Sequence, residues 1–278
     1  ILVLEPRRLA ARGAARRMAD TLGEDVGGTV GLRARLETRV SARTRIEVIT
    51  EGVFTRMILD DPALTGVAAV LFDEFHERSL DADLGLALAL DAQAGLREDL
   101  RLVVMSATLD GARTASLLAP GGAPIIESEG RMFPVETRHL GRDPAQRIED
   151  QMTAAILAGL RAEPGSVLAF LPGQGEILRV ADRLGERIRD PGIEICPLYG
   201  AMDVRGQDRA IRPADAGRRK VVLATSIAET SLTIEGVRVV VDSGLARAPR
   251  YEPDVGITRL ETVRVSRAAA DQRRGQIG

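Results

Sequence analysis

The 278-residue sequence is poor in the residues that build disulfide frameworks, zinc sites and membrane spans. Its one cysteine, Cys196, excludes a disulfide framework, and its two histidines, His76 and His139, lie far apart, which argues against a structural zinc site. No apolar run approaches the roughly 18 residues that span a bilayer. The chain starts with an apolar run followed by arginines, the reverse of a signal peptide. We therefore expect a globular protein without membrane segments in a reducing, cytoplasmic setting.

Lysine is almost absent, because Lys220 is the only one in the chain. Lys and Arg together number 38 against 40 acidic residues, and the net charge of −2 gives no general attraction to phosphate backbones. Nearly every positive charge is a guanidinium, which suits bidentate phosphate contacts. A GC-rich genome also raises the arginine content, so both explanations of the excess stay open.

The hydrophobic pattern alternates between short apolar runs and longer amphipathic ones. With 45% hydrophobic residues the chain can bury sizeable cores, and its length suits two domains. The leucines of residues 84–90 alternate as in a strand, but the Ala/Leu content and the lack of β-branched residues favour a helix. The first half predicts strands at 1–5, 45–50, 67–72 and 101–106 and helices at 7–23, 51–61 and 83–96.

The pattern weakens near residues 128–136 and then restarts, so we place a domain boundary at about residue 134. Continuous apolar strands alternating with helices are typical of parallel sheets covered on both faces. We expect an α/β fold with domains 1–134 and 135–278. The second half predicts strands at 166–173, 193–200, 220–225 and 237–244 and a helix at 175–189.

The segment AVLFDEFHERS places Asp73, Glu74, His76 and Glu77 directly after an apolar strand. One interpretation is a solvated turn at a sheet edge. The other is a metal and water site, because ligands bind beyond the carboxyl ends of parallel strands and carboxylates there hold Mg²⁺ and orient water. This motif alone leaves the two interpretations level.

Further motifs follow other predicted strands in a fixed order. They are EPRRLAAR (5–12), TEGVFTR (50–56), SATL (106–109), ATSIAETSLTIEG (224–236) and QRRG (272–275). With these the chain resembles the DEAH-box branch of the superfamily 2 helicases, and within it the bacterial HrpB-type ATP-dependent helicases, in which DEFHERS with Phe is the usual form. The resemblance covers essentially the whole chain and implies two tandem RecA-like domains.

The resemblance also implies roles for individual residues. Asp73 and Glu74 would hold Mg²⁺, Glu74 would position and deprotonate the attacking water, and His76 would contact the facing domain. The remaining residues fall into three groups: Ser106 and Thr108 would couple hydrolysis to the grip on RNA, Arg7, Arg8, Thr50, Gly52 and Thr225 would contact the backbone of a single RNA strand, and Ser231, Thr233, Gln272 and Arg273 would face the nucleotide.

The implied activity is that of an ATP-dependent RNA helicase, with ATP and Mg²⁺ as cofactors. ATP would lie between the two domains, and its hydrolysis would drive translocation along a nucleic acid, which we expect to be single-stranded RNA. Backbone contacts of this kind are independent of base sequence. A translocase that acts on DNA is therefore a further possibility.

Two features depart from the helicase pattern. The motif G-x-x-x-x-G-K-[ST], whose loop and lysine hold phosphates, is absent from this sequence, and Gln276 occupies a position at which the family carries arginine. The chain starts without Met and ends within QRRGQIG, so we expect a segment of a longer protein with both domains truncated at their outer ends. We expect this segment to hydrolyse ATP negligibly. An alternative is a degenerate helicase that clamps RNA or a protein without hydrolysis.

Overall fold

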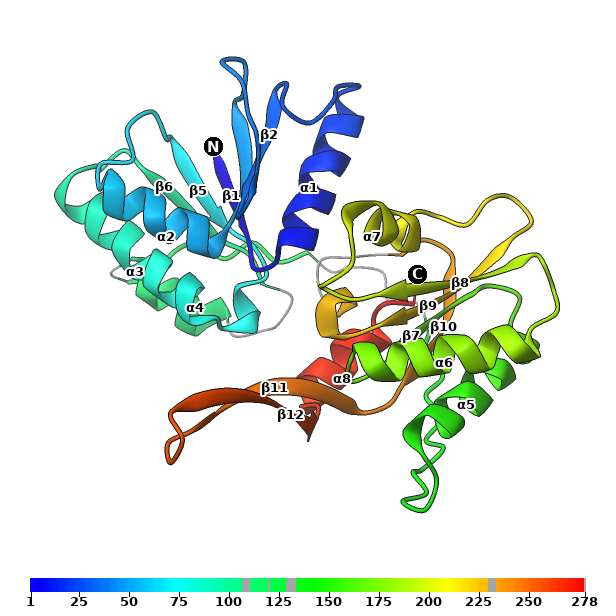
Figure 1. Ribbon diagram of the computed structural model, residues 1–278. Helices are drawn as coiled ribbons and strands as arrows, with labels where there is room; N and C mark the ends of the chain where they lie inside the picture. Colours follow the sequence, from blue (N-terminus) through cyan, green and yellow to red (C-terminus); the bar gives the residue numbers. More distant parts are fainter. Residues whose placement is uncertain (107–110, 120, 129–133, 230–233, 278) are drawn as a thin grey trace. The chain divides into compact units, whose positions relative to one another are not determined.

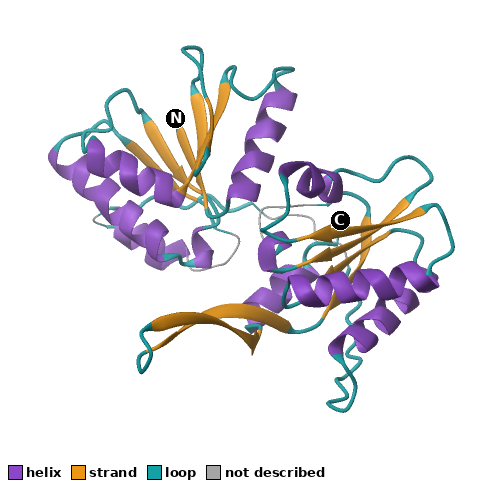
Figure 2. Cartoon of the chain, in the orientation of Figure 1, coloured by secondary structure: helices purple, strands orange, loops and turns teal. Residues whose placement is uncertain are grey.

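The computed structural model describes residues 1–106, 111–119, 121–128, 134–229 and 234–277. The chain forms two compact units, Ile1–Gly130 and Arg131–Gly278. Figure 1 traces the chain through both units, and Figure 2 shows strands and helices present in each.

The first unit is built on a mostly parallel sheet. Its strand order is β3-β2-β4-β1-β5-β6, in which β2 and β3 are antiparallel and the other neighbours are parallel. Because β4, β1, β5 and β6 run parallel side by side, the residues that follow them lie along one edge of the sheet. The strands are β1 (Leu2–Glu5), β2 (Val30–Ala34), β3 (Glu37–Arg39), β4 (Ile46–Thr50), β5 (Ala69–Phe72) and β6 (Arg101–Val104).

Helices cover both faces of this sheet. Successive side chains of a strand point to opposite faces. Accordingly, Leu2 and Leu4 pack with α2 and α3, while Val3 packs with α1 on the other face. Figure 1 shows α1 on the opposite side of the sheet from α2 and α3. The helices are α1 (Arg8–Thr21), α2 (Glu51–Asp60), α3 (Leu80–Gly95) and α4 (Gly111–Leu118).

The second unit contains a parallel sheet with the strand order β10-β7-β9-β8. Helices α5 and α6 pack together against one face of it, around Ile156 and Val180. Strands β11 and β12 form a separate antiparallel hairpin. The elements are α5 (Ile148–Ala162), β7 (Ser166–Phe170), α6 (Gln174–Arg187), β8 (Ile193–Leu198), α7 (Val204–Ile211), β9 (Arg219–Ala224), β10 (Val237–Asp242), β11 (Leu245–Glu252), β12 (Ile257–Arg264) and α8 (Arg267–Arg274).

The predicted α/β class with mostly parallel sheets flanked by helices is confirmed. Each strand and helix expected from the apolar pattern is present within a few residues, including the alternating-leucine segment, which forms α3. The structure adds elements that the pattern does not predict: β2, β3, α4, α5, α7, the β11–β12 hairpin and α8. Among the helices in the described ranges, none combines the length and the hydropathy needed to cross a bilayer.

The lone lysine and the lone cysteine are both buried in the second unit. Lys220 Nζ donates to the carbonyl oxygens of Arg209 (2.6 Å) and Arg212 (2.7 Å), at the carboxyl end of α7. A cation suits this position because the last carbonyls of a helix lack intrahelical donors and carry partial negative charge. Burial raises the pKa of the Cys196 thiol to about 11, so this thiol is protonated at neutral pH.

Candidate functional site

The acidic segment after β5 is tied to the strands on both sides of it. The backbone N–H of Asp73 donates to the Leu4 carbonyl on β1 at 3.0 Å. The N–H of Phe75 donates to the Met105 carbonyl, just beyond β6, also at 3.0 Å. The Phe75 ring is buried against Phe72. These contacts fix the position of Asp73 and Glu74 at the carboxyl edge of the sheet.

The backbone of this segment is strained at two residues. Glu74 and Arg78 adopt the left-handed conformation, with φ of 49° and 53°, on either side of the short 3-10 helix η1 (Phe75–Glu77). Such a conformation costs a non-glycine residue on the order of 1 kcal/mol and occurs preferentially at functional sites. The strain is therefore an observed feature that favours a functional role for the segment.

Side chains within the segment contact one another. Asp73 Oδ1 accepts a hydrogen bond from the Glu74 N–H at 2.8 Å. His76 Nε2 lies 3.3 Å from Glu74 Oε2, and the two side chains are only 11% and 20% exposed. A solvated turn would expose these side chains to water. Their burial therefore favours the interpretation of the segment as a metal and water site.

Other predicted site residues follow the neighbouring parallel strands of the same sheet. Arg7 comes two residues after β1, Thr50 ends β4, and Ser106 comes two residues after β6. The parallel pairing of β4, β1, β5 and β6 brings these positions to the same edge as Asp73. Ser106 is exposed, and Thr50 precedes α2 without capping it through its side chain.

Arg8 and Gly52 begin helices at this edge and are exposed. Arg8 is the first residue of α1, and Gly52 is the second residue of α2. A β-carbon added at Gly52 would approach no atom more closely than Asp81 Oδ2, at 3.6 Å. Packing therefore does not demand glycine at this position.

Two contacts at this edge involve residues for which the sequence indicates no role. Arg7 donates to Glu77 Oε2 at 3.2 Å, and the Ser79 hydroxyl donates to Glu51 Oε2 at 2.5 Å. Burial is the main cause that raises the pKa of Glu51, while the bond from Ser79 lowers it. Glu51 and Glu77 lie inside the motifs TEGVFTR and DEFHERS, and this position in a motif is the only sequence signal that could have indicated them.

In the second unit, Thr225 and Gln272 are both half-buried. Thr225 directly follows β9, and its hydroxyl oxygen accepts from the Ile227 N–H at 3.4 Å, which caps the short helix η2 (Ser226–Ala228). Gln272 lies on α8. The structure thus places Thr225 at the carboxyl end of a parallel strand, as the sequence predicts for that strand.

Arg273 is buried in a network of acidic partners. Its side chain is 1% exposed and pairs with Asp242 Oδ1 at 2.6 Å and with Glu229 Oε2 at 3.5 Å. Its guanidinium also lies 4.8 Å from the centre of the Phe170 ring. The expected nucleotide contact of Arg273 stays a prediction, and in this structure the guanidinium is committed to carboxylates of its own unit.

Gln276 contacts the same acidic residue. Its side-chain Nε2 donates to the backbone carbonyl of Glu229 at 3.1 Å. Arg273 thus contacts the carboxylate of Glu229, and Gln276 contacts its backbone carbonyl. Three predicted site residues, Thr108, Ser231 and Thr233, lie outside the described residues.

Asp73 and Glu74 are better suited to binding Mg²⁺ than to binding a metal ion whose ligands are all protein side chains. Among the described residues, no group of three or more His, Cys, Asp or Glu side chains could enclose a metal ion. Mg²⁺ commonly takes only one or two carboxylates and completes its shell with water and substrate phosphates. The pair at the end of β5 therefore fits the ion that the sequence predicts.

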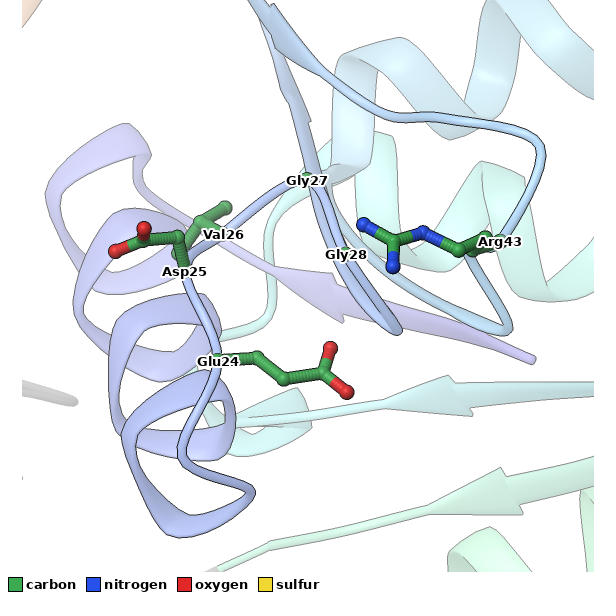
Figure 3. A pocket seen from close by; sticks show the side chains of 6 residues that line it. All are labelled: Glu24, Asp25, Val26, Gly27, Gly28 and Arg43. Carbon is green, nitrogen blue, oxygen red and sulfur yellow. The ribbon is translucent and has the colours of Figure 1, made fainter.

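A surface pocket of the first unit lies away from these residues. Its lining belongs to the segments that precede β2 and β4, so it lies at the amino edge of the sheet. Figure 3 shows the Arg43 guanidinium extending from one side of it toward the glycine-containing loop. The lining residues are Glu24, Asp25, Val26, Gly27, Gly28 and Arg43.

Comparison with known proteins identifies relatives over the whole chain. Residues 149–278 match the family of the helicase conserved C-terminal domain. The ATP-dependent RNA helicase HrpB of Escherichia coli (strain K12) is 55% identical over 278 residues, which cover 100% of this chain and 34% of the relative. The pre-mRNA-splicing factor ATP-dependent RNA helicase prp22 of Schizosaccharomyces pombe is 38% identical, over 99% of this chain and 24% of the relative.

Solved structures give the same result. The crystal structure of the Escherichia coli DEAH/RHA helicase HrpB matches with a TM-score of 0.91 and 56% identity, over 100% of this chain and 35% of that one. A crystal structure of the Escherichia coli DExH-box NTPase HrpB matches with a TM-score of 0.81 and the same identity. The chain spans about a third of the length of these HrpB proteins. The chain is thus similar over its whole length to HrpB-type DEAH/RHA helicases.

Proposed function

We propose that the chain provides core parts of an ATP-dependent RNA helicase. The observation that carries this proposal is the convergence of Arg7, Thr50, Asp73 and Ser106 at the carboxyl ends of four adjacent parallel strands. Ligands of open parallel sheets bind at this edge. In the proposal, residues 1–134 form the ATP-binding domain and residues 135–278 the helicase C-terminal domain.

Asp73 and Glu74 would serve the hydrolysis of ATP. Asp73 would help to hold Mg²⁺, which neutralises charge on the phosphates when bound. Glu74 would orient the attacking water and accept its proton. The position of His76, 3.3 Å from the Glu74 carboxylate, supports a role in orienting that carboxylate, alongside the contact with the facing domain that the sequence predicts.

Arg7, Arg8, Thr50, Gly52 and Thr225 would contact the backbone of a single strand of RNA. Contacts to phosphates and sugars position a strand without reading its bases, so the binding would be independent of sequence. Ser106 and Thr108 would couple this grip to hydrolysis and hence to movement along the strand. A reducing, cytoplasmic setting accords with this function.

The nucleotide would be faced from the second unit by Ser231, Thr233, Gln272 and Arg273. Arg273 is buried, so it would act on the nucleotide site indirectly, by holding Glu229 and Asp242 in place. A polypeptide of these 278 residues would hydrolyse ATP negligibly, because its sequence contains no G-x-x-x-x-G-K-[ST] motif and Gln276 supplies no positive charge.

RNA binding by the 278-residue chain tests the proposal. Affinity for a fluorescent single-stranded RNA should fall steeply with salt, because bound phosphates release counterions. Arg7→Ala should weaken binding and lower the salt slope by about one phosphate contact. Arg43→Ala, which removes an exposed arginine at the opposite edge of the same sheet, is the matched control and should leave the slope unchanged.

Equal effects of Arg7→Ala and Arg43→Ala would contradict the proposed RNA edge. A single-stranded DNA of the same sequence provides the second arm of the experiment, and clearly tighter binding to DNA would favour a DNA translocase. A steady-state ATPase assay with and without RNA completes it, since RNA-stimulated turnover at ordinary enzyme rates would contradict the expected inactivity of this chain.

A non-hydrolysing clamp is the second candidate. The observation in its favour is the contact of Gln276 with the Glu229 carbonyl, which gives a neutral side chain a structural role where the family carries arginine. Replacing Gln276 with arginine discriminates between the two. A helicase-derived enzyme site should gain affinity for a fluorescent ATP analogue, whereas a clamp should lose stability without gaining nucleotide affinity.

A further inference from the structure

The segment Glu77–Ser79, which follows the acidic turn after β5, contacts residues at the starts of α1 and α2. Glu77 Oε2 accepts from Arg7, which precedes α1, across 70 positions of sequence. The two side chains are 15% and 31% exposed. The contact is therefore partly shielded from water, and screening by salt weakens it less than it would weaken a pair on the open surface.

The same segment is anchored by its other end. The Ser79 hydroxyl oxygen accepts from the Ala82 N–H at 2.9 Å, which caps α3, and its hydroxyl donates to Glu51. Glu51 is the first residue of α2, directly after Thr50, and is 7% exposed. With Ser79 fixed between α2 and α3, the position of Glu77 two residues earlier is also constrained.

We propose that Glu77 is a positioning residue for Arg7, so that the segment carrying Asp73 and Glu74 also sets the geometry of an RNA contact. This inference rests on the proposed function, in which Arg7 binds a phosphate. A guanidinium presents five N–H donors in a planar fork, so one edge can rest on the Glu77 carboxylate while another binds a phosphate. Holding the fork in place before RNA arrives lowers the conformational entropy lost on binding.

The charge of Glu77 has an opposite, long-range effect. A carboxylate near the RNA repels phosphates, so its removal by itself would tighten binding. The sign of the change therefore separates positioning from simple repulsion. Glu47 provides a matched control, because it pairs with Arg33 in the same unit at 3.0 Å and the two side chains are 24% and 36% exposed.

The experiment measures RNA affinity of the 278-residue chain by fluorescence anisotropy over a range of salt. Glu77→Ala should weaken binding about three- to ten-fold, the size typical of coupled contacts, while Glu47→Ala should leave it unchanged or slightly tighter. In an Arg7→Ala background, Glu77→Ala should not weaken binding further; loss of the repelling carboxylate should leave the affinity unchanged or slightly higher. A merely structural loss would add to the effect of Arg7→Ala.

Glu77→Gln keeps the side-chain shape and one acceptor, and it remains informative if the alanine variant folds poorly. An affinity for Glu77→Gln between those of wild type and Glu77→Ala is expected. If Arg7→Ala weakens binding but both Glu77 variants match or exceed wild type, the inference is wrong and the proposed RNA contact stands. If the wild-type chain shows no salt-dependent RNA binding, the proposed function itself fails.

Discussion

Replacing Arg273 with alanine should strongly destabilise the second unit. The substitution removes the cation that pairs with both the Asp242 and the Glu229 carboxylates. It also removes the guanidinium from the Phe170 ring. Because Arg273 is 1% exposed, water does not readily replace it.

The magnitude follows from the burial of the pair. Breaking a buried ion pair by removing one partner costs about 3–5 kcal/mol. The Asp242 side chain is 23% exposed, which reduces the loss, and the ring contact adds about 0.5–2 kcal/mol. We therefore expect a loss of roughly 3–5 kcal/mol, which corresponds to a lowering of Tm by about 10–16 °C for a unit of this size.

Tyrosine fluorescence during urea unfolding reports on this unit alone. The chain has no tryptophan, and its two tyrosines, Tyr199 and Tyr251, both lie in the second unit. The adjacent Arg274 supplies the control, since its side chain is 51% exposed and lies 3.7 Å from Asp271. Arg274→Ala should change the free energy of unfolding by no more than about 0.5 kcal/mol. A loss below about 1 kcal/mol for Arg273→Ala, or one equal to that of Arg274→Ala, would show that the buried ion pairs of Arg273 contribute little to stability.

Two further substitutions probe buried charges. Burial raises the pKa of Glu51, so the folded first unit favours the protonated form of this side chain. The stability gained from this preference is fully present below the usual pKa range of a carboxyl group, and it is lost as the pH rises through the raised pKa. Glu51→Gln should therefore be more stable than wild type at neutral pH, by circular dichroism, with a difference that shrinks toward pH 4; a gap independent of pH would contradict this. Lys220→Met removes two donors to the end of α7 and should cost about 2–4 kcal/mol in the tyrosine assay, and an unchanged midpoint would show that those carbonyls are satisfied otherwise.

The alternation of strands and helices was predictable from the sequence because it is recorded in neighbouring residues. The run around Val3 is apolar on both faces, as a strand covered on both sides requires, and the Ala/Leu composition of α3 outweighs its alternating leucines. The order of the motifs that follow these strands could also be identified from the sequence. For this reason the carboxyl edge of the sheet could be named before its geometry was known.

Two of the elements that the pattern missed, the β11–β12 hairpin and α8, bury few apolar side chains. The hairpin strands β11 and β12 are largely exposed, and polar residues such as Arg247 and Glu261 alternate with apolar ones that have no core to enter. Helix α8 contains no aliphatic side chain larger than alanine, and its one buried side chain is the cation of Arg273. Patterns based on burying apolar faces do not indicate such elements.

The α/β alternation, the family resemblance and the residues that follow each strand were predictable from the order of amino acids. The tertiary structure alone decided which of those residues meet, since Arg7 reaches Glu77 across 70 positions and Arg273 reaches Asp242 across 31. The physical reason is range: backbone preference and hydrophobic period act over a few residues, whereas ion pairs between distant residues depend on the order in which strands join the sheet.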